Sequence, residues 1–318
     1  MSTRELDAAG ITDPALRASY ETCRRLNAEH GRTYYLATLL LPPHKRPHVH
    51  ALYGFARYAD DFVDSLEAPD PDRLVSWGAE FLDALRHGGS RDPVAAAAGH
   101  TMHRYDIPVA HVEAFLASMR QDITVTRYRT YDDLRAYMYG SAAVIGLQMT
   151  PVLGVLTPEA YPRARTLGEA FQLTNFIRDV AEDLVRGRVY LPMEDLDAFG
   201  VTPDDLRPGP VSDGVRALVR HEVARARSLY AEAEPGIDML EPTSRDCVRT
   251  AFTLYGGILD AVERADHDVL NQRVAVSLPR RLRTALPRLA AARRARRRES
   301  PRAARRGGPR TPTRSSTG

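Results

Sequence analysis

Carboxylates spaced one helical turn apart occur in two segments of the 318-residue sequence. The first acidic segment is residues 57–64, RYADDFVD, in which Asp60 and Asp64 fall on one helical face and Arg57 lies about one turn earlier. Two stacked carboxylates repel each other and favour a bound cation, and an oxygen-rich site suits Mg²⁺. Because the preceding residues are largely apolar, we expect a buried helix, where unpaired carboxylates are costly.

The second acidic segment is residues 172–183, QLTNFIRDVAED. On a helix, Gln172, Asn175, Asp179 and Asp183 form a polar stripe about three turns long, and Arg178 lies beside it. The intervening residues are mostly apolar and would pack against other helices. A polar stripe on an otherwise apolar helix predicts that the stripe lines a cavity.

Either segment alone is more typical of a solvated helix face than of a site. Together they favour a shared site, because each includes an arginine and each is embedded in apolar sequence. Facing each other across a helical bundle, they would hold several divalent ions. Such ions and guanidinium groups bind diphosphate oxygens and stabilise departing pyrophosphate. The residues therefore predict ionisation of an allylic diphosphate to a carbocation.

The elements that must position these residues are helices. Proline, glycine and capping residues divide the chain into helical segments, and no convincing alternating strand is present. We predict an all-α, single-domain multi-helix bundle with a central cavity over residues 16–287, after a flexible arm at 1–15 and before an Arg-rich, disordered tail at 288–318. The predicted helices are 14–41, 44–66, 72–87, 92–105, 108–127, 131–155, 158–184, 203–206, 211–235, 243–271 and 279–297.

Composition limits the class of protein. Hydrophobic residues make up 43% and charged residues 27%, which argues against wholesale disorder. The first ten residues lack the apolar core of a signal peptide, and no run reaches the roughly 18 apolar residues of a membrane-spanning helix. Two distant cysteines, Cys23 and Cys247, form no metal or disulfide framework. We expect a cytoplasmic protein, with peripheral contact at the inner face of the membrane.

The motifs, in order, resemble those of the phytoene and squalene synthases, which condense two prenyl diphosphates head to head. The similarity runs over about residues 18–282 and covers segments 30–43, 51–64, 137–146, 172–192, 255–260 and 273–274. Segments 137–146 and 172–192 are most similar to those of bacterial carotenoid enzymes. The resemblance implies a helical bundle of the isoprenoid synthase type. Two departures stand near the expected pocket: Tyr34 replaces the usual Phe, and residues 143–146, AVIG, replace the usual GTVG.

Roles for individual residues follow from the resemblance. Mg²⁺ ions would be held by Asp60, Asp64, Asp179 and Asp183, with Asp61 a weaker candidate. The two diphosphates would be bound by Arg32, Thr33, Arg57, Gln172, Asn175, Arg178, Tyr255 and Arg273. Catalysis would involve Tyr137 near the reacting carbons, with Arg57, Arg178, Asp60 and Asp179.

The implied reaction is the Mg²⁺-dependent condensation of two geranylgeranyl diphosphates to phytoene through a cyclopropyl diphosphate, the first committed step of carotenoid biosynthesis. Mn²⁺ is an alternative ion, NADPH is not expected, and downstream carotenoid enzymes are the expected protein partners. Three alternatives stay open: a squalene or dehydrosqualene-type synthase using farnesyl diphosphate, a helical terpene cyclase acting on one substrate, and a non-catalytic protein that uses its basic tail.

Other polar clusters have simpler interpretations. Asp132 and Asp133 stand at a predicted helix start, where carboxylates cap free N–H groups. His44, His48 and His50 lack an acidic or cysteine partner, so we interpret them as a polar helix face. The arginines between 288 and 314 could bind anionic lipid or nucleic acid. We favour a lipid role or none, and expect no nucleic acid, because the product would be an apolar hydrocarbon.

Overall fold

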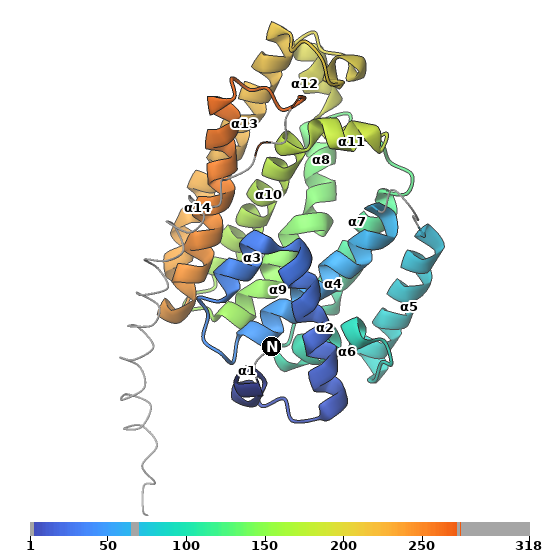
Figure 1. The fold of residues 1–318 in the computed structure, drawn as a ribbon, viewed down its shortest axis with the longest axis vertical. Coiled ribbons are helices and arrows are strands. Elements are labelled where there is room, and N and C mark those ends of the chain that lie inside the picture. The colour runs from blue at the N-terminus through green and yellow to red at the C-terminus, as the bar shows by residue number, and fades with distance from the viewer. Residues whose placement is uncertain (1–2, 65–69, 272–273, 275–318) are drawn as a thin grey trace, which may run out of the picture.

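The structure, a computed structural model, describes residues 3–64, 70–271 and 274, and the side chain of Asp64 falls outside that description (Figure 1). Over these ranges the fold is all-α, as predicted, with two isolated β-bridges that join Arg127 to Val189 and Val155 to Leu240. None of the helices described is both long and apolar enough to cross a bilayer.

Seventeen helical elements follow one another along the described chain. They are α1 (Thr3–Ala8), α2 (Pro14–His30), α3 (Arg32–Thr38), α4 (Arg46–Asp64), α5 (Pro71–His87), α6 (Pro93–Arg104), α7 (Val109–Gln121), α8 (Tyr131–Met138), the π-helix η1 (Tyr139–Ala143), α9 (Val144–Leu153), α10 (Ala160–Arg178), α11 (Val180–Val185), α12 (Met193–Ala198), the 3₁₀-helix η2 (Pro203–Leu206), α13 (Asp213–Ala233), the 3₁₀-helix η3 (Glu234–Met239) and α14 (Pro242–Arg264).

The predicted flexible arm is wrong for residues 3–13. Residues 3–8 form α1, and the side chains of Leu6 and Ile11 are buried in the core. Glu5 binds Arg46 at 2.6 Å between Oε1 and Nη1, which ties this segment to the start of α4. The segment is polar on average, and this average led to the prediction of a flexible arm. The burial of its two apolar side chains stabilises its packing against the core.

Three predicted helices are interrupted. Gly31 separates α2 from α3, at a point where a Cβ atom would lie 2.6 Å from the ring of Tyr53. Residues 139–143 of the predicted 131–155 helix form η1, and Asp179 separates α10 from α11. The short helix α12 was not predicted. Each interruption lies beside the cavities described below.

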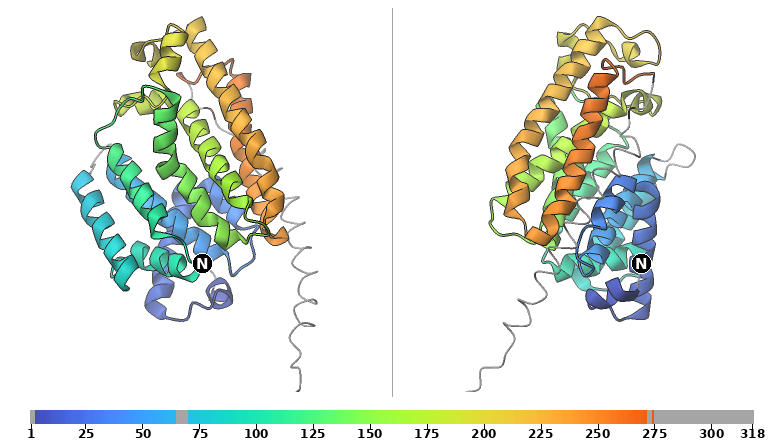
Figure 2. Two further views of the ribbon diagram at one scale, coloured as in Figure 1. Left: turned by 180° about the vertical axis from the view of Figure 1, so that it is seen from behind. Right: turned by 60° about the vertical axis from the view of Figure 1, so that its left-hand side comes forward.

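The core has two hydrophobic clusters. One lies mainly among α2, α4, α5, α6 and α7, and the other mainly among α8, α10, α13 and α14. Phe171, on α10, packs against both clusters. In Figures 1 and 2, α13 and α14 run side by side along one edge of the bundle, and α3 lies next to α14. The space between the clusters, bordered by α3, α4, α10 and α14, contains the candidate site.

Lys45, the only lysine in the sequence, joins three elements at one end of the bundle. Its Nζ donates to the carbonyl oxygen of Leu153 and to Oε2 of Glu241, each at 2.6 Å, and to Oγ of Ser244 at 3.1 Å. The ammonium group has three donors, so these three acceptors satisfy it completely. The contact fastens the end of α9 to the segment before α4 and to the start of α14.

Candidate active site

Two adjoining cavities lie between the core clusters. The first, here called the polar cavity, has a volume of about 360 Å³ and is lined largely by charged and aromatic residues. The second, the apolar cavity, has a volume of about 330 Å³. Six residues line both cavities and define the junction between them: Tyr34, Tyr53, Ala56, Ser141, Gln172 and Asn175.

The first acidic segment lies on α4. Leu52, Phe55 and Ala59 are fully buried in the core, so the helix directs Arg57 and Asp60 towards the polar cavity, which both line. Arg57 Nη1 donates to Asp60 Oδ2 at 3.1 Å, and Arg57 also pairs with Asp61. Asp64 ends the helix.

The second acidic segment is bent. Asp179 leaves helical geometry at φ −104° and ψ 15°, between α10 and α11. The helical hydrogen bond from the Asp183 N–H to the Asp179 carbonyl, at 2.8 Å, is retained across the bend. Asp183 therefore stays one turn after Asp179, and the polar stripe continues past the bend. Gln172, Asn175, Asp179 and Asp183 all line the polar cavity, together with Arg178 and Glu182. The predicted meeting of the two acidic segments is therefore present in the fold.

The carboxylates of the polar cavity suit cations that arrive with a diphosphate. In the part of the chain that the structure describes, no three acidic, cysteine or histidine side chains form a closed metal site. Asp60 pairs with Arg57, and Asp179 pairs with Arg178. Mg²⁺ typically takes one or two protein carboxylates and completes its octahedron with water and substrate phosphate. The donor set fits that kind of site.

Three arginines supply positive charge to the same cavity. Arg57 and Arg186 each bury an Nε atom that finds no hydrogen-bond partner among the described residues, and both line the cavity with Arg178. Burial disfavours the charged form of Arg178, but its hydrogen bond to Asp179 and the charge of that carboxylate raise its pKa above the ordinary value. The guanidinium groups stay cationic and can donate several hydrogen bonds to an anion.

A buried carboxylate orients two tyrosines at the base of the polar cavity. Tyr137 Oη donates to Asp122 Oδ2 at 2.7 Å, and Tyr190 Oη donates to Asp122 Oδ1 at 3.0 Å. Arg188 Nη2 donates to the Asp122 carbonyl at 3.0 Å. Burial, and next the charge of Asp122, raise the pKa of Tyr137 well above its usual value, so its hydroxyl remains protonated.

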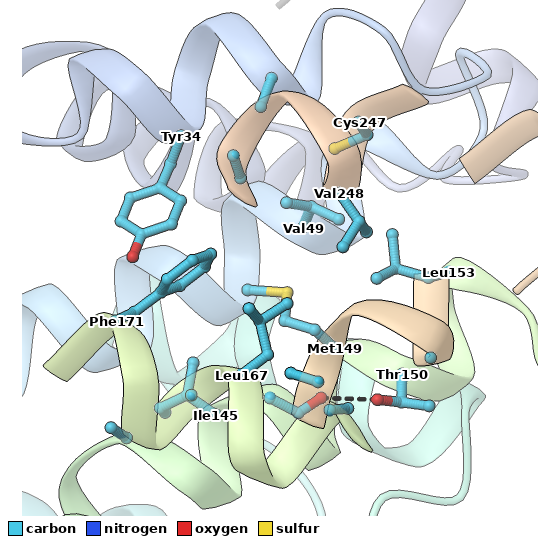
Figure 3. A pocket seen from close by; sticks show the side chains of 18 of the residues that line it. Tyr34, Val49, Ile145, Met149, Thr150, Leu153, Leu167, Phe171, Cys247 and Val248 are labelled. Atoms are coloured by element: carbon cyan, nitrogen blue, oxygen red, sulfur yellow. Dashed lines mark hydrogen bonds between the residues drawn. The ribbon is translucent and has the colours of Figure 1, made fainter. Parts of the chain in front are cut away.

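Aromatic rings surround the junction. The ring centroids of Tyr34 and Tyr255 are 5.0 Å apart, and those of Phe171 and Tyr255 are 4.6 Å apart. In Figure 3 Tyr34 and Phe171 lie at one end of the apolar cavity, while Leu153, Cys247 and Val248 lie at the other. Ring faces attract cations that lack other solvation. The arrangement can therefore take an amphipathic ligand with its anionic head among the arginines and its apolar tail beyond the rings.

The family model described as squalene/phytoene synthase matches residues 27–280. This chain belongs to the squalene/phytoene synthase family. The phytoene synthase of Arthrospira platensis is 39% identical over 279 residues, which cover 83% of this chain and 90% of the relative. The 15-cis-phytoene synthase of Synechocystis is 37% identical over 282 residues, covering 84% of this chain and 83% of the relative.

Solved structures agree with this membership. A dehydrosqualene synthase with a bound ligand has a TM-score of 0.79 at 27% identity, covering 87% of this chain and 98% of that one. The squalene synthase HpnC from Alicyclobacillus acidocaldarius has a TM-score of 0.74 at 30% identity, covering 82% and 98%. This member of the squalene/phytoene synthase family is a prenyltransferase with the helical isoprenoid synthase fold.

Most of the predicted site residues of this squalene/phytoene synthase family member lie together. The polar cavity is lined by Arg57, Asp60, Tyr137, Gln172, Asn175, Arg178, Asp179, Asp183 and Tyr255. Arg32 and Thr33 stand at the start of α3, where Arg32 is exposed and neither lines the polar or the apolar cavity. Arg273 lies outside the described residues. Asp61 pairs with Arg57 but does not line the cavity.

Sequence reasoning missed several residues at the site. Asp122, Arg186 and Tyr190 line the polar cavity. Arg186 and Tyr190 lie in the segment that carried the family resemblance and could have been singled out there. Asp122 directly follows the last residue of α7, and no spacing pattern marks it. Its role depends on partners 15 and 68 residues away along the chain.

Two of the simpler interpretations are settled by the structure. Asp133 accepts from the Thr130 N–H and Thr130 Oγ1 accepts from the Asp133 N–H, so the predicted capping role is confirmed for Asp133. The interpretation of the histidines as a polar helix face is wrong for His48 and His50, which are buried. His50 Nδ1 is 2.9 Å from Asn27 Nδ2, so its polarity is satisfied inside the core.

Proposed function

We propose that this chain condenses two molecules of geranylgeranyl diphosphate head to head to form phytoene, a step of carotenoid biosynthesis. The observation that carries the proposal is the junction: a cavity rich in carboxylate and guanidinium groups opens directly onto an apolar cavity through six shared residues. Identities of 39% and 37% to phytoene synthases support this product over the shorter hydrocarbons.

The diphosphate heads would bind in the polar cavity. Arg57, Arg178 and Arg186 would donate hydrogen bonds to the phosphate oxygens, and the amides of Gln172 and Asn175 would contact the ester end. Mg²⁺, held by Asp60, Asp64, Asp179 and Asp183, would neutralise the diphosphate charge and so favour departure of pyrophosphate. The guanidinium groups are already in place before the substrate arrives, which is how a preorganised site lowers the barrier.

The chemistry would take place in two ionisations. In the first, the C1–O bond of the donor breaks and its electron pair leaves with pyrophosphate. The C2=C3 double bond of the acceptor attacks the allylic cation, and loss of one proton closes a cyclopropyl diphosphate. In the second, this diphosphate ionises, the ring rearranges, and loss of another proton gives phytoene. Two substrates yield one hydrocarbon, two pyrophosphates and two protons.

The apolar cavity would protect the cations. Much of its lining is hydrocarbon, and side chains such as those of Ile145, Leu153 and Leu167 carry no lone pair that could add to a carbocation (Figure 3). Excluding water prevents its addition to the intermediates. The rings of Tyr34, Phe171 and Tyr255 would face the positive charge where it forms.

A product assay tests the proposal. The purified chain is incubated with Mg²⁺ and either geranylgeranyl or farnesyl diphosphate, with and without NADPH, and the hydrocarbons are identified by mass spectrometry. Phytoene from the longer substrate without NADPH is the expected result. A product from farnesyl diphosphate alone would assign the chain to the squalene or dehydrosqualene branch instead. No condensation product from either substrate would overturn the proposal.

A further inference from the structure

We propose that the hydroxyl of Ser141 donates a hydrogen bond to the ester oxygen that joins C1 of the prenyl chain to its diphosphate. The bond would strengthen as the C1–O bond breaks and negative charge builds on that oxygen. This inference rests on the proposed function and adds a catalytic residue that neither acidic segment contains. No atom is transferred, because the serine keeps its proton and pyrophosphate leaves with the electron pair.

Ser141 stands at the boundary between the two cavities. It is one of the six junction residues, and it belongs to the π-helix η1. A prenyl diphosphate is charged at one end and apolar at the other, so the bond between these two parts must cross the junction. Of the junction residues, only Ser141, Tyr34 and Tyr53 carry a hydroxyl group. The serine hydroxyl is therefore a donor at the place where the reacting bond has to lie.

Close backbone packing fixes the position of η1. A Cβ atom on Gly140 would collide with Ser118 Oγ and the Ala114 carbonyl oxygen of α7. On the opposite side, a Cβ atom on Gly168 of α10 would lie 2.6 Å from the Ala142 carbonyl oxygen. The π-helical turn is thus held between two helices and cannot turn Ser141 away without moving one of them. Single π-helical turns inside α-helices occur frequently at functional sites.

The Ser141 hydroxyl is buried and has no hydrogen-bond partner among the residues that the structure describes. Two buried hydroxyls on neighbouring helices are paired: Ser118 Oγ donates to the Tyr137 carbonyl at 3.0 Å, and Thr174 Oγ1 donates to the Ala170 carbonyl at 2.7 Å. Tyr128 Oη, beside Tyr137, is buried without a partner among the described residues, but Tyr128 does not line the junction. A buried hydroxyl without a partner costs free energy. At this junction the cost is removed when a ligand oxygen arrives. Among the described junction residues, Asn175 Oδ1 is the other buried polar atom without a hydrogen-bond partner.

The first test compares Ser141→Ala with the unmodified chain, using geranylgeranyl diphosphate and Mg²⁺. Loss of one preorganised donor to the leaving oxygen should lower kcat by about 10-fold to 100-fold with little change in KM. Ser141→Thr, which keeps the hydroxyl, should recover part of the rate. Thr250→Val is the matched control, because Thr250 Oγ1 is also buried without a partner in the described part of the chain but lines neither cavity. It should retain the full rate.

A second test locates the bond on the substrate. Geranylgeranyl S-thiolodiphosphate has sulfur in place of the ester oxygen, and sulfur is a weak acceptor. The dissociation constant of this analogue should be the same for the unmodified chain and Ser141→Ala. Weaker binding of the analogue by the variant would overturn the assignment to the ester oxygen. An unchanged kcat in Ser141→Ala would overturn the inference while leaving the proposed function intact. No turnover by the unmodified chain would overturn both.

Discussion

Asp60 and Asp179, one from each acidic segment, line the same cavity, and each pairs with an arginine that could instead hold phosphate. Asp60 and Asp179 come from α4 and from the bend after α10. Neither side chain packs in the apolar core, since both are partly exposed to the cavity. Their removal should therefore affect chemistry more than stability.

Asp60→Asn and Asp179→Asn should each abolish phytoene formation while leaving the unfolding temperature nearly unchanged. Each change removes one negative charge from the expected metal site, while the amide oxygen of the asparagine can still accept a hydrogen bond from the neighbouring arginine, so the cost to stability is small. Rates are measured by hydrocarbon extraction, and folding by thermal melts. Asp72→Asn, an exposed change in the first turn of α5, is the control. A near-normal rate in either variant would remove that residue from the metal site.

Asp122 acts through other residues, because its oxygens hold the hydroxyls of Tyr137 and Tyr190. Asp122→Asn keeps the shape but weakens two charge-assisted hydrogen bonds, each worth about 1.5–3 kcal/mol. We expect the variant to unfold at lower urea concentration and to turn over at least about 10-fold more slowly. The exposed change Asp197→Asn should do neither. Full activity in Asp122→Asn would show that the orientation of Tyr137 does not matter.

At the scale of elements, the site residues are positioned by interruptions of helices as well as by the helices themselves. The bend at Asp179 keeps the polar stripe facing the cavity, and η1 brings Ser141 to the junction. Both features lie in stretches that were predicted to be continuous helices. Elements are also held together by single side chains. In the Lys45 cluster, one ammonium group binds the end of α9 and the start of α14 to the segment before α4.

Lys45→Met should lower the free energy of unfolding by about 1–3 kcal/mol, because it leaves the Leu153 carbonyl and Ser244 with fewer donors. The loss is smaller than for a fully buried ion pair, since the Glu241 side chain is 47% exposed. Urea denaturation measures the change. Lys45→Arg should not restore stability, because a planar guanidinium does not match three converging acceptors. Restoration by arginine would contradict this account of the cluster.

The stability contributed by the charged cluster of Asp195 on α12 and Glu222 and Arg225 on α13 should depend on pH. Burial, opposed by Arg225 and reinforced by the charge of Asp195, raises the pKa of Glu222 to about 8. In the folded chain Glu222 thus keeps a proton that the unfolded chain releases near pH 4.5. Its contribution to stability is fully present below that pH and is lost as the pH rises towards 8.

Between pH 6.5 and 8 the free energy of unfolding should therefore fall, by at most about 1.4 kcal/mol per pH unit from this group. Glu222→Gln keeps a hydrogen-bonding side chain without the titration, so its curve should be flatter over the same range. His221 lies 3.5 Å from Asp195 and could also contribute to a pH dependence. As a control, the same two curves are measured in chains that also carry His221→Gln. Parallel curves for the unmodified chain and the Glu222→Gln variant would exclude this effect.

At the scale of the whole molecule, the proposed hydrocarbon product would have to leave a protein in which no described helix can span a membrane. We propose that the protein acts in the cytoplasm and contacts the inner face of the membrane through the Arg-rich tail, which lies outside the described residues. Truncation after Leu289 should reduce sedimentation with anionic liposomes and leave binding to neutral liposomes as it was. Unchanged sedimentation with anionic liposomes would remove the lipid role.

The sequence by itself determined the features that depend on local spacing. Local patterns predicted the all-α fold, the capping by Asp133 and the polar stripes of the two acidic segments, because residues within a few turns of a helix have a fixed relative placement. The order of motifs also indicated the family, which the matched range 27–280 confirms. The roles of the site residues and of the metal remain predictions.

The tertiary structure alone decided which distant groups meet. Asp122 pairs with Tyr190 across 68 positions, and Lys45 with Glu241 across 196. The break that forms η1 depends on close packing of Gly140 and Gly168 against neighbouring helices. The packing of Leu6 and Ile11, and the burial of His48 and His50, likewise depend on elements elsewhere in the chain. Such contacts leave no periodic pattern in sequence, because the free energy that selects them comes from packing between elements.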